Sequence, residues 1–101
     1  MNSNVALSIV VPIYNEEESL PFLVSQLQEV LQPMAETFEL VLVNDGSSDN
    51  SAEVIRKLSF KVPELVGVLL RKNYGQTAAM AAGFDISSGQ IVVTLDGDLQ
   101  N

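Results

Sequence analysis

Four short runs rich in valine, isoleucine and leucine divide the chain at similar intervals, and each gap between them is long enough for one helix. The runs cover residues 7–12, 38–43, 65–70 and 90–95. Parallel strands need crossover connections of this length, usually helical, whereas tight hairpins join antiparallel strands. The pattern therefore predicts an α/β fold: a Rossmann-like, three-layer α/β/α arrangement around a parallel sheet.

Three helices are expected in the gaps between these runs. The first follows a polar turn, has Ser19 or a near neighbour as its cap, and carries a one-sided apolar stripe. The stripe consists of Leu20, Leu23, Val24, Leu27, Val30 and Leu31. The second is expected at residues 50–60, where Glu53 stands three residues after Asn50, as in a capping box. The third, at residues 76–86, is rich in alanine and is expected to pack closely against the sheet.

Size and composition limit the classes of function. The 101 residues suffice for one small domain, and the net charge of −8 argues against a broad basic surface for nucleic acid. The absence of cysteine and histidine excludes disulfides, thiolate or histidine metal sites and a histidine-dependent triad. No apolar stretch approaches the roughly 20 residues that span a bilayer, so the chain as given is expected to be soluble. Met34 and Met80 are expected to fill gaps in the core.

The last apolar run ends in an acidic turn. Residues 91–95 form an unbroken apolar stretch, which is typical of a strand buried on both faces, and Asp96, Gly97 and Asp98 follow it. Ligands of open parallel sheets bind where the strands end. Two carboxylates at such a position could hold Mg²⁺ or Mn²⁺, which prefer oxygen ligands.

Polar turns follow three of the four predicted strands, at residues 12–16, 44–49 and 96–100. Because parallel strands share their carboxyl ends, all three turns are expected at one edge of the sheet. Simpler roles are expected for several of their polar residues and for those just beyond. Glu17 and Glu18 are interpreted as acids in the first turn of the first helix, favoured by its dipole. Capping and turn roles are expected for Ser47, Ser48 and Asp49.

These turns together resemble a known family. Pro12-Ile13-Tyr14-Asn15-Glu16, Asn44-Asp45-Gly46-Ser47-Ser48-Asp49, Arg71-Lys72-Asn73-Tyr74-Gly75-Gln76 and Asp96-Gly97-Asp98-Leu99-Gln100 are similar to the motifs of family 2 glycosyltransferases with the GT-A fold. Within that family the chain looks most like polyprenyl-phosphate sugar transferases of the dolichol-phosphate mannose synthase type. The resemblance covers residues 8–101. It implies a strand order of 3-2-1-4. One departure is Asn44, where many relatives carry aspartate.

The resemblance also implies roles for individual residues. Pro12, Tyr14 and Glu16 would border the nucleoside, and Val43 and Asp45 would border the base. Asp45 would accept a hydrogen bond from a ring N–H or amino group. The sugar nucleotide would lie against Asp96, Gly97 and Asp98, and Asp98 would be the residue assigned to catalysis. The metal ligands would be Asp96, Asp98 and Gln100.

The implied activity is the metal-dependent, inverting transfer of a sugar from a UDP- or GDP-linked donor, with Mg²⁺ or Mn²⁺ as cofactor. The implied acceptor is a lipid phosphate, and a saccharide hydroxyl is the alternative. We expect residues 1–101 to form the nucleotide-sugar-binding part of a larger domain, inactive alone and oligomeric through an exposed apolar edge. The full-length protein is expected at the cytoplasmic face of a membrane.

Two other classes fit parts of the sequence. A strand followed by D-x-D also opens phosphatases of the haloacid dehalogenase type, but there the motif follows the first strand, whereas here it follows the last. Non-catalytic α/β modules, such as flavodoxin-like receivers, also gather acids at strand ends. Those modules do not need the Pro12, Tyr14 and Glu16 group.

Overall fold

Strands and helices alternate along the whole of the described chain. A computed structural model of the protein describes residues 4–34 and 36–95. The elements are β1 (Leu7–Ile13), α1 (Leu20–Leu31), β2 (Phe38–Asn44), α2 (Ser51–Lys61), β3 (Leu65–Leu69), α3 (Gln76–Ile86) and β4 (Ile91–Thr94). Each predicted strand and helix is present, with ends shifted by a residue or two at most positions.

The four strands form one parallel sheet in the order β3-β2-β1-β4. Leu7 of β1 lies opposite Phe38 of β2 on one side and Ile91 of β4 on the other. The strand order expected from the family resemblance is therefore confirmed, with β4 beside β1. All four strands point their carboxyl ends to the same edge of the sheet, which is called the carboxyl edge below.

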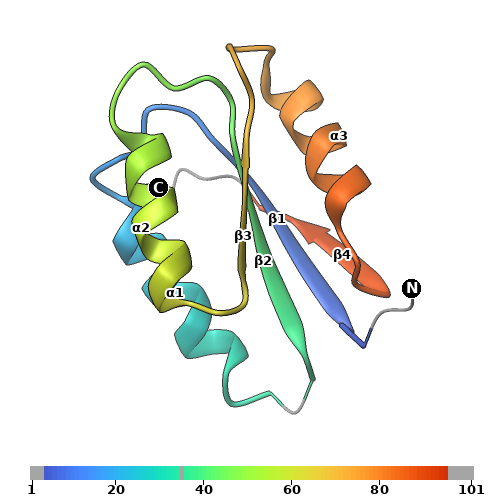
Figure 1. Cartoon of the computed structure of the whole chain (residues 1–101). Helices are drawn as coiled ribbons and strands as arrows, with labels where there is room; N and C mark the ends of the chain where they lie inside the picture. Colours follow the sequence, from blue (N-terminus) through green and yellow to red (C-terminus); the bar gives the residue numbers. More distant parts are fainter. Residues whose placement is uncertain (1–3, 35, 96–101) are drawn as a thin grey trace.

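The two faces of the sheet carry different helices (Figure 1). Side chains alternate along a strand, so β1 sends Ile9 and Val11 to one face and Val10 to the other. The first face packs against α1 and α2 and holds the larger apolar core. The second face packs against α3 through a small cluster of Val10, Val41, Val43 and Ala79. The predicted three layers are present.

Helix α1 buries most, but not all, of its predicted stripe. Leu20, Leu23, Val24 and Leu31 are buried. Val30, however, is 65% exposed, and Met34 beyond the helix is exposed as well. The expectations that these two side chains fill the core are wrong: Val30 lies on the solvent side of the helix, next to the buried Leu31, and Met34 lies in the turn after it.

Small residues bring α3 close to the sheet, as the sequence predicted. A Cβ built on Gly83 would lie 2.4 Å from Val10 Cγ1 and 3.1 Å from Val43 Cγ2. Ala79, one turn earlier, is fully buried against the same strands. The backbone of α3 therefore sits at a distance that no larger side chain at position 83 would permit.

Strand β4 is not buried on both faces, and that prediction is wrong. Ile91 is 63% exposed, and Val92 and Val93 are also exposed. The strand order explains the difference, because β4 lies at an edge and pairs only with β1 among the described strands. An exposed apolar edge favours association, so the oligomer expected from the sequence stays a prediction that sedimentation would test.

Candidate functional site

The loops that follow β1 and β2 are joined to each other at the carboxyl edge. Asn15 has a positive φ of 53°, a conformation that asparagine adopts more readily than most residues. Its Oδ1 accepts hydrogen bonds from the N–H groups of Ser48 (2.8 Å) and Asp49 (3.3 Å). Its own N–H donates to Ser47 Oγ at 2.9 Å. Two of the predicted polar turns therefore meet.

Glu17 links the same two loops from its other side. Its N–H donates to Asp49 Oδ2 at 3.2 Å, and its Oε1 accepts a hydrogen bond from the N–H of Asn50 at 3.0 Å. Helix α1 begins only at Leu20, so Glu17 and Glu18 precede the helix. Their interpretation as first-turn acids is wrong, because Glu17 is used to bridge loops.

Of the two capping arrangements expected at the start of α2, the one with Asp49 is present and the capping box of Asn50 and Glu53 is absent. Ser51 donates two hydrogen bonds to Asp49 Oδ1, from its N–H at 2.9 Å and from its Oγ at 2.6 Å. The capping role expected for Asp49 is confirmed. Glu53 makes no capping box with Asn50 and instead pairs with Arg56 at 2.8 Å.

Hydrogen bonds lower the pKa of Asp49. Burial by itself would raise the pKa of this carboxyl, but the bonds donated by the hydroxyl and N–H of Ser51 and by the N–H of Glu17 outweigh it, so the pKa falls below its ordinary value. Asp49 is thus held as a carboxylate by the two loops that it joins.

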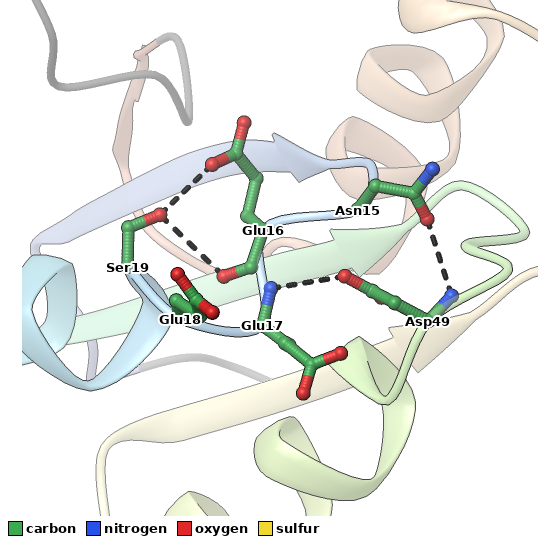
Figure 2. Close-up of a pocket in the computed structure, with 6 residues that line it drawn as sticks. All are labelled: Asn15, Glu16, Glu17, Glu18, Ser19 and Asp49. Atoms are coloured by element: carbon green, nitrogen blue, oxygen red, sulfur yellow. Dashed lines mark hydrogen bonds between the residues drawn. The ribbon is translucent and has the colours of Figure 1, made fainter.

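An acidic pocket of about 400 Å³ opens beside these loops. Figure 2 shows its lining, with the Glu16 carboxylate pointing away from Asp49. Ser19, which stands at the N-cap position of α1, donates its hydroxyl to Glu16 Oε1 at 2.8 Å and makes no side-chain cap. Among residues 4–34 and 36–95, no group of three acidic, histidine or cysteine side chains is arranged to hold a metal ion.

Asp45, at the end of β2, is almost fully buried and holds the loop between β3 and α3. It is 3% exposed. Its Oδ1 accepts a hydrogen bond from the N–H of Tyr74 at 2.8 Å. Its Oδ2 accepts bonds from Asn73 Nδ2 and from the N–H of Gly75, each at 3.0 Å. Asn73 Nδ2 also donates to the backbone oxygen of Asp45 at 3.1 Å.

The same two loops touch through their backbones. Gly46, directly after Asp45, has a φ of 65°, and a Cβ on it would lie 2.1 Å from the carbonyl carbon of Lys72. Gly75 has a φ of 104° and precedes the first residue of α3. Both positions need glycine, for close approach at the first and for the backbone conformation at both. The loop after β3 is thereby fixed against the end of β2.

Several of the residues expected to border a nucleotide stand at this edge. Tyr14, directly after β1, is 48% exposed, Glu16 is half-buried, and Pro12 is half-buried within β1. Val43 is different: it is fully buried and packs in the cluster beneath α3. The expectation that Val43 borders the base stays a prediction, and it would apply to the backbone of Val43, because the alternation of β2 turns the side chain into the core.

The D-x-D motif lies outside the described residues, and so do all the residues with predicted roles in metal and sugar-nucleotide binding there: Asp96, Gly97, Asp98 and Gln100. Leu95, the last described residue, donates its N–H to the backbone oxygen of Val10 at 3.0 Å. The chain therefore reaches the motif from a position beside β1.

Sequence reasoning gave no role to the turn of Asn73, Tyr74 and Gly75. Tyr74 is 53% exposed, and Lys72 Nζ lies 5.5 Å from the centroid of its ring. A signal was present, because an Asn-Tyr-Gly turn directly after a parallel strand must lie at the carboxyl edge. What could not be foreseen is its partner, since Asp45 stands 28 to 30 residues earlier in the chain.

Comparison with known proteins leads to the same family that the sequence motifs resemble. Residues 8–101 match the family described as "Glycosyl transferase family 2". The chain belongs to this family. The resemblance noted from the strand-end turns is therefore confirmed, and so is the α/β architecture of the GT-A type.

Curated relatives are similar over nearly the whole chain. The undecaprenyl-phosphate 4-deoxy-4-formamido-L-arabinose transferase of Aeromonas hydrophila is 47% identical over 102 residues, which cover 99% of this chain and 31% of that protein. The enzyme of the same name from Yersinia enterocolitica is 47% identical over 97 residues, which cover 94% of this chain and 29% of that protein. The chain thus spans about a third of the length of these relatives.

Solved structures share the fold. TarS (residues 1–349) of Staphylococcus aureus superposes with a TM-score of 0.78 and 26% identity, covering 93% of this chain and 28% of that one, and it was also solved with UDP. A mannosyltransferase of Pyrobaculum calidifontis, solved with GDP-Man and Mn²⁺, gives a TM-score of 0.74 at 24% identity, covering 95% of this chain and 28% of that one. The second likeness supports the fold alone.

Proposed function

We propose that the chain binds a nucleotide-diphosphate sugar at the carboxyl edge and is part of a glycosyltransferase that transfers the sugar to a polyprenyl phosphate. The observation that carries the proposal is the 47% identity, over 99% of the chain, to a transferase named for undecaprenyl phosphate. The match covers nearly the whole chain and therefore includes the polar turns as well as the core.

The nucleoside would lie over the ends of β1 and β2. Tyr14 offers an exposed aromatic residue there, Pro12 and Glu16 stand on either side of it in the chain, and Asp45 directly follows the neighbouring strand. Ligands of open parallel sheets bind at this edge. TarS, which was solved with UDP and with UDP-GlcNAc, supports a nucleotide diphosphate as the ligand class.

A divalent ion would be held by Asp96, Asp98 and Gln100, with Asp98 as the residue closest to the chemistry. Their oxygen atoms suit Mg²⁺ or Mn²⁺. Such an ion, when bound, neutralises the diphosphate and stabilises it as a leaving group. The hydrogen bond from the N–H of Leu95 to the backbone oxygen of Val10 would start the motif beside β1.

The acceptor class rests on chemistry as well as on the relatives. A lipid phosphate is already an anion at neutral pH, so its attack on the sugar needs no strong general base. The chain contains no histidine that could act as one. Because such an acceptor lies in a bilayer, the whole protein would work at the cytoplasmic face of a membrane. Within the described part of the chain, none of the helices has the length and apolar character of a membrane span.

The test is transfer of a radiolabelled sugar from UDP- or GDP-linked donors to undecaprenyl phosphate by the whole protein that contains this chain. UDP-linked 4-deoxy-4-formamido-L-arabinose is the first donor to try, because the relatives are named for that sugar. We expect label in the lipid phase, lost in Asp98→Ala and kept in Asp85→Ala, an exposed aspartate on α3. Label that enters only a water-soluble saccharide would reject the lipid acceptor.

A further inference from the structure

We infer that β3 is a docking edge for a second copy of this chain, with the two β3 strands running antiparallel about a two-fold axis at Gly67. The inference does not rest on the proposed function. Strand β3 forms the edge of the sheet opposite β4, and among the described strands it pairs only with β2. Its other side is therefore open to a further strand.

The backbone of β3 directs alternate residues to this open side. Glu64 C=O, just before the strand, and Leu70 N–H, just after it, both bond to β2 at 2.9 Å. These two bonds fix the even-numbered residues of the stretch as those whose backbone groups face β2. By alternation, Leu65, Gly67 and Leu69 direct their backbone groups to the open side.

The sequence of β3 reads the same in both directions, Leu-Val-Gly-Val-Leu, with Gly67 at its centre. In an antiparallel pair centred there, the Gly67 N–H of each copy would donate to the Gly67 C=O of the other, and Leu69 N–H would donate to Leu65 C=O. The side chains match as well, with Leu65 opposite Leu69 and Val66 opposite Val68. A two-fold interface joins identical surfaces, so it needs this self-complementarity.

No charge or proline protects β3 from such pairing, although edge strands commonly carry them. Gly67 and Leu69 are both exposed, Leu69 by 43%. Strand β4 exposes more apolar side chain but lacks the symmetry, because pairing about its own centre would place Ile91 opposite Thr94. The open side of β3 is therefore the better match for a second copy.

Charges at the two ends of β3 are complementary in the same arrangement. The acidic Glu64 precedes the strand, and the basic Arg71 and Lys72 follow it. Both basic residues are exposed, and Glu64 is half-buried. Antiparallel pairing brings the Glu64 end of each copy beside the Arg71 end of the other. Parallel pairing would instead place like charges together, which is unfavourable.

A cavity of about 180 Å³ between α2 and β3 offers room for a side chain of the second copy. It is lined by Ile55, Arg56, Ser59, Gly67 and Leu69. A Cβ on Gly67 would lie 2.7 Å from Ile55 Cγ2, so this position has no side chain of its own to offer. Leu69 of the second copy would stand diagonal to Gly67, at this cavity. Arg56 brings no unpaired charge there, because Glu53 pairs with it at 2.8 Å.

The two-fold axis of such a pair is perpendicular to the sheet, which would continue from one copy into the other. The carboxyl edges of the two copies then point in opposite directions but lie at the same height along the axis. Neither proposed nucleotide site is covered, because β3 separates the docking edge from the ends of β1 and β2. Both sites therefore stay equivalent in the pair.

The first test is sedimentation of the whole protein that contains this chain, over a range of concentrations. We expect association that Leu69→Lys weakens at least about tenfold, because the lysine would face the apolar Leu65 of the other copy. Leu69→Ile keeps an apolar side chain and should associate like the wild type. Ile91→Lys, the matched change at the β4 edge, should leave the association unchanged. Loss of association in Ile91→Lys but not in Leu69→Lys would overturn the inference.

The second test is site-resolved hydrogen exchange of the same proteins, which reports on β3 even where other parts of the whole protein also associate. The amides of Val66 and Val68 face β2 and should exchange slowly at every concentration. Those of Gly67 and Leu69 should exchange at least about tenfold more slowly at high concentration than when dilute, and Leu69→Lys should abolish this difference. Rapid exchange of Gly67 and Leu69 at every concentration would overturn the inference, and so would slow exchange that Leu69→Lys leaves unchanged.

Discussion

Glu39 and Asp45 stand at opposite ends of β2, and their carboxylates hold the connections on either side of α3. Glu39 accepts a hydrogen bond from the N–H of Ser88, after the helix. Asp45 accepts hydrogen bonds from the N–H groups of Tyr74 and Gly75, before the helix. One strand thus fixes both ends of a helix that follows it by more than thirty residues. The end that Asp45 holds lies at the proposed nucleotide site.

Loss of Glu39 should therefore destabilise the fold without touching the site. Glu39→Ala leaves Ser8 Oγ and the N–H of Ser88 without their acceptor, and we expect a loss of about 1–3 kcal/mol in the free energy of unfolding. Urea unfolding followed by circular dichroism measures it. Glu29→Ala, at an exposed position on α1, is the control and should change stability by less than about 0.5 kcal/mol. Equal effects of the two changes would mean that the Glu39 bonds contribute nothing.

Close packing of α3 gives a second prediction. Gly83→Ala places a Cβ 2.4 Å from Val10 Cγ1, and overpacking of this kind costs about 1–3 kcal/mol. Thermal unfolding should show a lower melting temperature for this variant. The double variant Val10→Ala/Gly83→Ala removes the clashing methyl group, so it should be more stable than the sum of the two single changes predicts. Strict additivity would contradict the contact.

The lowered pKa of Asp49 predicts how the stability of the fold changes with pH. A carboxyl whose pKa is lower in the folded state than in the unfolded state stabilises the fold above its unfolded pKa, which is 3.8 for an aspartate. That contribution is lost as the pH falls through the folded pKa. Asp49→Asn should therefore lower the melting temperature at pH 7 and lose its effect toward pH 3.

The affinity for UDP or GDP at pH 7 should stay nearly unchanged in Asp49→Asn, because Asp49 is bonded to Ser51 and Glu17 within the protein. Melting curves between pH 7 and pH 3, together with one calorimetric titration, measure both quantities. A difference from wild type that grows on acidification would have the wrong sign for this account.

Periodicity and turn chemistry predicted most of the fold. Apolar runs placed all four strands, an apolar stripe placed the first helix, and turn residues and alanine content placed the other two. The run of alanines around Gly83 also predicted close packing of α3. These features depend on residues near each other in the sequence. Burial of β4 could not be predicted in this way, because an apolar run looks the same at an edge as at the centre of a sheet, and only the strand order separates the two.

The polar contacts were predicted least well. No bond between Asp45 and the turn about thirty residues later was predicted, yet its carboxylate accepts three hydrogen bonds from that turn. Asn50 was expected to pair with Glu53, yet its N–H donates to Glu17 from the preceding loop. Hydrogen bonds between loops of neighbouring strands leave no periodic trace in the sequence, because they depend on which strands become neighbours.

The most direct test of a nucleotide-diphosphate site at the carboxyl edge is a pair of calorimetric titrations, of UDP and GDP against the whole protein and against Asp98→Ala. Each titration is run with Mn²⁺ and again with a chelator, and uridine and guanosine serve as reference ligands. We predict that one diphosphate binds much more tightly with Mn²⁺, that Asp98→Ala loses this gain, and that nucleoside binding stays the same. Equal losses for diphosphate and nucleoside in Asp98→Ala, or equal binding with and without Mn²⁺, would contradict the account.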